Sequence, residues 1–111
     1  MGALDGVKVV EATLLVQGPQ AGLTLSDMGA DVIKVELPGI GDQARWIPID
    51  GAQDPRGPYY ISGNRGKRSV TIDLRTPGGR DAFLAIADTC DVFLSNFKPG
   101  TLDEWLSLIH I

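Results

Sequence analysis

Short β-branched runs alternate with helix-forming segments along the sequence, and this order restricts the fold more than any other feature. Residues 7–12 (VKVVEA) and 30–36 (ADVIKVE) have the length and composition of buried strands. Between them, Pro19 near the start and Gly29 after the end predict a helix over residues 19–28. Because the connections are short, the two strands are expected to pair in parallel.

The same order of elements returns in the second half of the chain. Residues 69–74 alternate as a strand does, Thr76 and Pro77 form a helix start, and residues 91–97 predict a fourth strand. Residues 37–66 are rich in Gly and Pro and predict a long loop. The chain is therefore expected to form one α/β domain, a partial, parallel, doubly wound (Rossmann-like) sheet of two βαβ units joined by that loop.

Composition excludes several classes of protein. The 111 residues are 43% hydrophobic and 22% charged, as in a soluble globular domain, and no apolar run reaches the ~18 residues of a membrane span. The opening residues lack a secretion signal, so we expect a cytoplasmic protein without a membrane partner. A single cysteine, Cys90, rules out an internal disulfide and, with one histidine, a four-ligand zinc site. The net charge of −4 argues against nucleic-acid binding.

Basic residues are concentrated in residues 64–80, which hold five of the ten in the chain against one acid, Asp73. These five are Arg65, Lys67, Arg68, Arg75 and Arg80. A local excess of positive charge on an acidic chain fits a phosphorylated ligand, and a solvated surface loop is the alternative. The helix that follows Arg75 adds free N–H groups and a positive dipole end, which together favour an anion site.

Ligands of parallel α/β sheets bind beyond the carboxyl ends of the strands, so the residues there are the candidates for a site. At the end of the strand expected over residues 91–97, Asn96 and Lys98 offer an amide and a cation, and the Phe97 ring faces either an adenine or the sheet interior. Glu36 ends a strand where such folds place a ribose-binding acid, with an ion pair to Arg45 as the alternative. No glycine fingerprint of a dinucleotide site is present, so a nicotinamide cofactor is not expected.

No catalytic group is indicated by spacing. No pair of carboxylates stands out as an acid/base couple, and neither Cys90 nor His110 has a partner at catalytic spacing. Taken by themselves, the residues predict a binding site and no catalytic residue.

Seven segments, in the same order and spacing, resemble the amino-terminal region of the family III CoA-transferases over about residues 4 to 103. They are residues 4–11 (LDGVKVVE), 18–19 (GP), 27–36 (DMGADVIKVE), 41–42 (GD), 64–69 (NRGKRS), 73–74 (DL) and 96–100 (NFKPG). That family includes formyl-CoA, carnitine-CoA and bile-acid CoA transferases and the related acyl-CoA racemases. The phosphates of coenzyme A would account for the cluster of basic residues.

The resemblance implies a CoA site and a covalent mechanism. Family members attack the acyl-CoA carbonyl with an aspartate, form a mixed anhydride and an aspartyl-CoA thioester, and need no metal or permanent cofactor. Their substrates are an acyl-CoA and a carboxylic acid, and intact members form interlocked homodimers. The residues expected to bind CoA are Val16, Gln17, Ile72, Asp73, Leu74, Arg75, Asn96, Phe97 and Lys98.

The resemblance also implies that the nucleophilic aspartate lies beyond residue 111. The chain is accordingly interpreted as a partial amino-terminal CoA-binding domain, inactive alone, whose last six residues, 106–111, depart from the family pattern and are open to being non-native. Two alternatives stay open. One is a fragment of an acyl-CoA racemase, and the other is a non-catalytic nucleotide-binding module.

Overall fold

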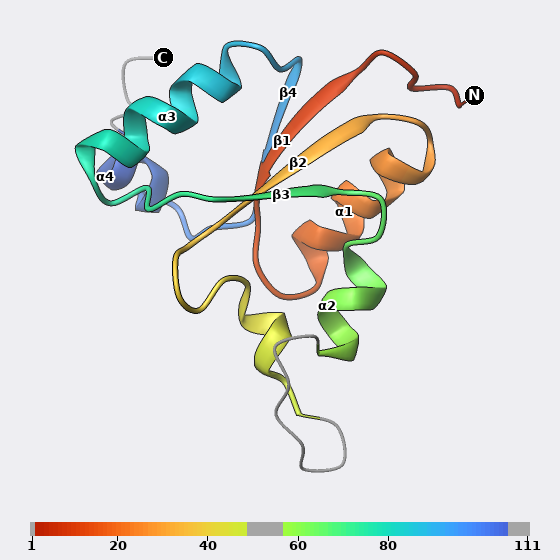
Figure 1. Ribbon diagram of the computed structural model, residues 1–111, viewed down its shortest axis with the longest axis horizontal. Coiled ribbons are helices and arrows are strands. Elements are labelled where there is room, and N and C mark those ends of the chain that lie inside the picture. Colours follow the sequence, from red (N-terminus) through yellow and green to blue (C-terminus); the bar gives the residue numbers. More distant parts are fainter. Residues whose placement is uncertain (1, 49–56, 107–111) are drawn as a thin grey trace.

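The computed structural model describes residues 2–48 and 57–106 and confirms the α/β class (Figure 1). Nine short elements follow one another in these residues, and the strands alternate with helices as the sequence predicts. In chain order they are β1 (Lys8–Ala12), α1 (Gln17–Asp27), β2 (Asp31–Glu36), the 3-10 helix η1 (Gln43–Trp46), α2 (Pro58–Gly63), β3 (Arg68–Thr71), α3 (Pro77–Ala87), β4 (Val92–Ser95) and α4 (Thr101–Leu106).

The four strands form one parallel sheet in the order β3-β2-β1-β4. This is the order of the first four strands of a doubly wound α/β sheet, in which the direction of winding reverses between β1 and β4. The two βαβ units are therefore unequal, because β1 and β2 are neighbours whereas β3 and β4 lie at opposite edges. The register pairs Ala12 with Ser95, so the residues after β1 and after β4 leave the sheet side by side.

Helices cover both faces of the sheet, and each face has its own apolar core (Figure 1). On one face, Val10 and Val35 pack with Phe83 of α3, whose ring meets Phe93 of β4 edge to face at a centroid distance of 5.4 Å. On the other face, Val9 and Val32 pack against residues that include Leu25 of α1. Alternate residues of a strand point to opposite faces, which explains why Val9 and Val10 serve different cores.

The start of α1 differs from the expected one. Helix α1 begins at Gln17 rather than at residue 19, because the first four N–H groups of a helix have no intrahelical acceptor and Pro19 therefore fits inside the first turn. Helix α3 begins as predicted, with Thr76 Oγ1 accepting a hydrogen bond from the Gly79 N–H at 3.0 Å. Its end at Ala87 is followed by a short turn into β4.

The expectation of a continuous loop over residues 37–66 is wrong. This segment contains η1 and α2, which are four and six residues long and too short to show a helical period in the sequence. The short helix α4 was not expected either. The expectation that left residues 106–111 open to being non-native concerns mostly residues 107–111, which lie outside the described residues.

Candidate functional site

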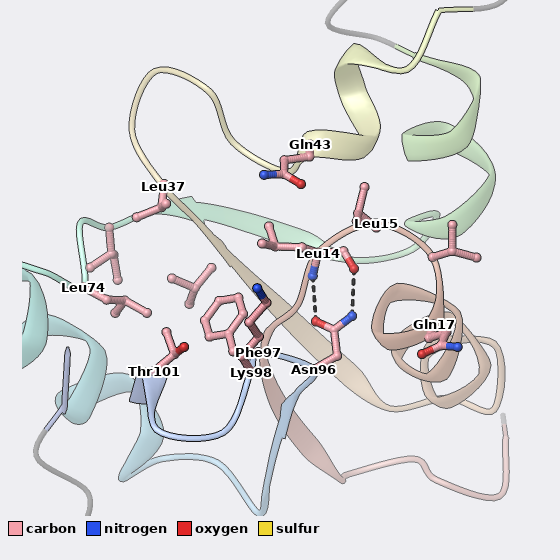
Figure 2. A pocket seen from close by; sticks show the side chains of 13 residues that line it. Leu14, Leu15, Gln17, Leu37, Gln43, Leu74, Asn96, Phe97, Lys98 and Thr101 are labelled. Carbon is pink, nitrogen blue, oxygen red and sulfur yellow. Dashed lines mark hydrogen bonds between the residues drawn. The ribbon is translucent and has the colours of Figure 1, made fainter. Parts of the chain in front are cut away.

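A hollow of about 680 Å³ lies at the carboxyl edge of the sheet, beside the reversal point between β1 and β4 (Figure 2). Its walls come from the loop after β1, the segment after β2, the end of β3 and the segment after β4. The lining residues are Leu14, Leu15, Val16, Gln17, Val35, Leu37, Gln43, Ile72, Leu74, Asn96, Phe97, Lys98 and Thr101. The lining is mainly apolar with a few amide groups, and its described residues include one charged side chain, that of Lys98.

The loop after β1 is fixed to the end of β4 by Asn96. The Asn96 Oδ1 accepts a hydrogen bond from the Leu14 N–H at 2.9 Å, and Asn96 Nδ2 donates one to the Leu14 carbonyl oxygen at 2.8 Å (Figure 2). One amide side chain thereby satisfies both polar groups of a backbone unit that is not part of the sheet. This pair joins two walls of the hollow that are more than eighty residues apart in the sequence.

Seven of the nine residues expected to bind CoA line this one hollow, and Asp73 and Arg75 do not. Those two bind each other at the end of β3, with Arg75 Nε donating to Asp73 Oδ1 at 2.9 Å. The side-chain and backbone hydrogen bonds from Arg75 hold the pKa of the Asp73 carboxyl below its usual value. The same pairing raises the pKa of Arg75. Ile72 and Leu74, on either side of Asp73 in the sequence, do line the hollow.

The basic residues of segment 64–80 do not gather at the hollow. Arg65 pairs with Asp27, Arg68 with Asp31 and Arg75 with Asp73, with N···O distances of 2.7, 2.7 and 2.9 Å. The expected phosphate-binding cluster is thus divided among separate ion pairs of this chain. Among the described residues, Lys98 is the basic side chain that faces the hollow, and no described carboxylate forms an ion pair with it.

Lys67, another basic residue of this segment, has a buried side chain. Its ammonium group lies 2.7 Å from Glu11 Oε1 and donates to the Pro19 carbonyl oxygen and Asn64 Oδ1 at 2.9 and 2.8 Å. Loss of solvent around the ammonium lowers the pKa of Lys67, while Glu11 acts in the opposite direction. Lys67 is therefore a structural group that ties the chain before β3 to β1 and α1.

Glu36 is occupied by an ion pair, the alternative that the sequence left open. Its carboxylate oxygens accept from Arg45 Nη2 at 2.9 and 3.1 Å, and the pair is largely buried. Arg45 also lies over the ring of Tyr60, 3.6 Å from its centroid. Burial, followed by the negative charge of Glu36, raises the pKa of Tyr60 to about 12. Nothing in this arrangement leaves Glu36 directed at a ribose.

Phe97 packs toward the sheet interior, which is one of the two alternatives that the sequence left open. It lines the hollow and also packs against the core between the sheet and α3.

Sequence reasoning missed Gln43, Leu37 and Thr101, which enter the lining from segments that carried no recognised element (Figure 2). Gly100, with φ of 88°, forms the turn directly before α4.

Two findings limit other kinds of site. In residues 2–48 and 57–106, no group of three or more His, Cys, Asp or Glu side chains is placed to hold a metal ion. Over the same residues, no helix has the length and apolar character needed to cross a membrane. Cys90 packs against the core next to α3, as expected for a small buried residue.

The chain forms a parallel α/β sheet with a mainly apolar hollow, edged by amides, at its reversal point. This arrangement is typical of the class of α/β proteins whose ligands bind at the carboxyl edge of the sheet. The sequence model of CoA-transferase family III matches residues 4–107. The chain belongs to this family.

Similar proteins of known name and structure agree with that assignment. The chain is 46% identical over 108 residues to a succinyl-CoA:mesaconate CoA-transferase of Haloarcula hispanica, covering 95% of this chain and 27% of that protein. It is 43% identical over 101 residues to the human succinyl-CoA:glutarate CoA-transferase, covering 89% of this chain and 22% of that protein. It therefore spans about a quarter of the length of these relatives.

Solved structures give the same result for the fold. A CAIB/BAIF family protein from Brucella suis superposes with a TM-score of 0.81 at 44% identity, over 94% of this chain and 28% of that one. The structure of Rv3272 from Mycobacterium tuberculosis superposes with a TM-score of 0.83 at 45% identity, over 97% of this chain and 29% of that one.

Proposed function

We propose that this chain supplies part of the acyl-CoA site of a CoA-transferase, an enzyme that moves coenzyme A between carboxylic acids. The observation that carries the proposal is the single hollow at the reversal point, lined by seven residues expected to bind CoA. The names of the relatives, which are transferases acting on CoA thioesters, support the same activity. The proposal makes residues 1–111 part of an amino-terminal CoA-binding domain.

The chemistry of the lining fits the central part of coenzyme A. The pantetheine arm alternates methylene groups with two amides, which match an apolar wall edged by the amides of Gln17, Gln43 and Asn96. Lys98 offers a point charge for a phosphate oxygen. The volume of about 680 Å³ suits a ligand of moderate size, so the hollow holds one portion of the cofactor.

The nucleophile in this proposal comes from outside these 111 residues, since the described lining includes no carboxylate. An aspartate carboxylate oxygen bonds to the acyl carbon, the C–S bond breaks, and a mixed anhydride and CoA thiolate form. The thiolate attacks the aspartyl carbonyl and releases the donor acid, which leaves an aspartyl-CoA thioester. The acceptor carboxylate then displaces the thiolate, and the thiolate attacks the new acyl carbon to free the aspartate.

The role of this chain in the sequence of steps is to hold coenzyme A while its sulfur leaves and returns. The thiolate must stay close to the anhydride, because a released thiolate ends the transfer. Binding of the pantetheine arm and the phosphates on rigid strand ends provides that retention. The loop from Leu14 to Gln17 is the wall proposed to face the thioester end.

Calorimetric titration of coenzyme A into the 111-residue chain tests the proposal. Lys98→Ala is expected to weaken binding about tenfold, the loss of one charge-assisted contact. Lys8→Ala is the matched control, because Lys8 is an exposed lysine at the amino end of β1, away from the hollow. Absence of any binding by the unmodified chain, or equal affinities for the two variants, would contradict the proposal.

A further inference from the structure

Leu15 has a backbone conformation that leucine rarely adopts. Its φ of 68° lies in the left-handed region, and it is the one non-glycine residue with positive φ among residues 2–48 and 57–106. The residue is part of the wall of the hollow, directly before the start of α1. Such a conformation persists only where the surrounding structure holds it, and it is frequent at functional sites.

Asp42 is the side chain that holds Leu15. Its Oδ1 accepts hydrogen bonds from the Leu15 N–H at 2.9 Å and from the Ala44 N–H at 2.8 Å. Asp42 is completely buried, although it lies in a segment of irregular backbone. The carboxylate thus fixes two chain segments at once, the loop after β1 and the beginning of η1.

Lys34 fixes the carboxylate in turn. Its ammonium group lies 2.7 Å from Asp42 Oδ2 and 3.7 Å from Glu11 Oε2, and all three side chains are fully buried. Glu11 also accepts a short hydrogen bond from Thr13. Because Lys34 and Glu11 stand on β2 and β1, the position of Asp42 is set by the sheet as well as by its own loop.

We propose that Asp42, held by Lys34, is a positioning residue for the CoA site. Asp42 acts on Leu15 from one side, and Asn96 acts on Leu14 from the other, so the wall from Leu14 to Gln17 is fixed before the ligand arrives. This inference rests on the proposed function, since it assigns the fixed wall to coenzyme A. Asp42 itself does not line the hollow and acts only through Leu15.

Two double variants test the hydrogen-bond acceptor for the Leu15 N–H separately from the ion pair of Asp42 with Lys34. Both Asp42→Asn with Lys34→Gln and Asp42→Ala with Lys34→Gln remove the charges of Asp42 and Lys34 together, and only the first keeps an oxygen for the Leu15 N–H. We expect the Asn variant to bind coenzyme A within about threefold of the unmodified chain, and the Ala variant to bind on the order of tenfold more weakly. Equal affinities of the two would overturn the inference.

A second pair of variants leaves the buried cluster intact and covers the case in which the Ala variant does not fold. Leu15→Met keeps a side chain without a branch at Cβ, whereas Leu15→Ile places a β-branched one at positive φ, where it is strained. The Met variant is expected to retain affinity and the Ile variant to lose about tenfold. Equal binding by these two variants would also overturn the inference.

Hydrogen exchange of the residue 15 amide, followed by NMR without ligand, distinguishes the two proposals. We expect protection in the unmodified chain and in the Asn variant, and its loss in the Ala variant. If coenzyme A does not bind at all, the proposed function fails, and the exchange pattern still decides whether Asp42 holds Leu15. Equal protection in the Asn and Ala variants would refute that hold.

Discussion

Gly79, in the first turn of α3, packs directly against the backbone carbonyl group of Asp73, and no room remains there for a Cβ atom. The contact brings the helix start against the end of β3, where Thr76 Oγ1 also donates to the Asp73 carbonyl oxygen at 2.9 Å. The neighbouring Gly78 has no atom within 4 Å of the place that its Cβ would take. The position of Gly79 therefore requires glycine, whereas the position of Gly78 has room for a Cβ atom.

Alanine at these two positions is predicted to change the free energy of unfolding in opposite directions. Gly79→Ala forces the helix away from β3 and is expected to destabilise the chain by about 1–3 kcal/mol. Gly78→Ala meets no obstacle and is expected to stabilise it by about 0.5–1 kcal/mol, since alanine favours helix more than glycine does. Urea denaturation of both variants measures the difference, and shifts of the same sign would contradict the packing described.

Replacement of Asn96 by Asp is predicted to open the wall between β1 and β4. The carboxylate of Asn96→Asp still accepts from the Leu14 N–H, but it places an oxygen against the Leu14 carbonyl oxygen where the amide donated. The expected cost is about 1–2 kcal/mol in the free energy of unfolding, together with weaker coenzyme A binding. Gln20→Glu, at an exposed residue of α1, is a control that adds a negative charge outside this pair. An Asn96→Asp variant as stable as the unmodified chain would show that the pair contributes nothing.

The raised pKa of Tyr60 predicts how stability varies in alkaline solution. Burial, followed by the charge of Glu36, raises it from 10.0 to about 12, so the folded chain keeps a proton that the unfolded chain loses. The contribution of Tyr60 is thus complete below pH 10 and is lost as the pH rises from 10 to about 12. Tyrosinate absorbance should show a late ionisation that Tyr60→Phe removes and Tyr59→Phe leaves. Loss of the late step in Tyr59→Phe instead would contradict the assignment.

The strands could be predicted because local composition determines them. Residues 8–12 and 31–36 are β-branched runs that suit a buried parallel sheet whatever surrounds them. Helices η1 and α2 escaped prediction because a helix of four to six residues completes no repeating apolar face, and Pro58 at the first turn of α2 is its one local signal. Here, the contacts of α2 with η1 and α1, and not the local sequence, decide the structure.

The residues of the candidate site also fall into two groups, those that the sequence could predict and those that it could not. That the ends of β1 and β4 share a hollow follows from the rule for parallel sheets, and Asn96 could be chosen on that ground, whereas Val16 came from the family resemblance. The ion-pair partners of the basic side chains could not be predicted, because the partners of Arg65 and Arg68 lie 38 and 37 residues away in the sequence. A count of charge in a segment says nothing about which acid the fold brings beside each cation.

The Asp73 carboxyl provides a pH-dependent test of its pair with Arg75. Because the pKa of Asp73 is held below 3.8, the pair contributes stability above the unfolded value, and this contribution is lost as the pH falls through the lower folded value. In Arg75→Ala the pKa is expected to rise toward its ordinary value, as measured by a carboxyl ¹³C NMR titration. Arg65→Ala, whose acid is Asp27, should leave the Asp73 titration unchanged. An unaltered Asp73 titration in Arg75→Ala would contradict the pairing.

The pairing of Arg75 with Asp73 also predicts an exchange of partners when coenzyme A binds. Arg75 is 59% exposed, and exposed ion pairs are weak enough for a phosphate to replace the carboxylate. Asp73→Asn removes the competing charge and is expected to tighten coenzyme A binding about threefold, whereas Arg75→Ala weakens it. Asp27→Asn, which frees Arg65 away from the hollow, is the matched control and should not change the affinity. If Asp73→Asn and Asp27→Asn bind coenzyme A equally, Arg75 does not contact its phosphates, and Lys98 alone carries the charge recognition at these strand ends.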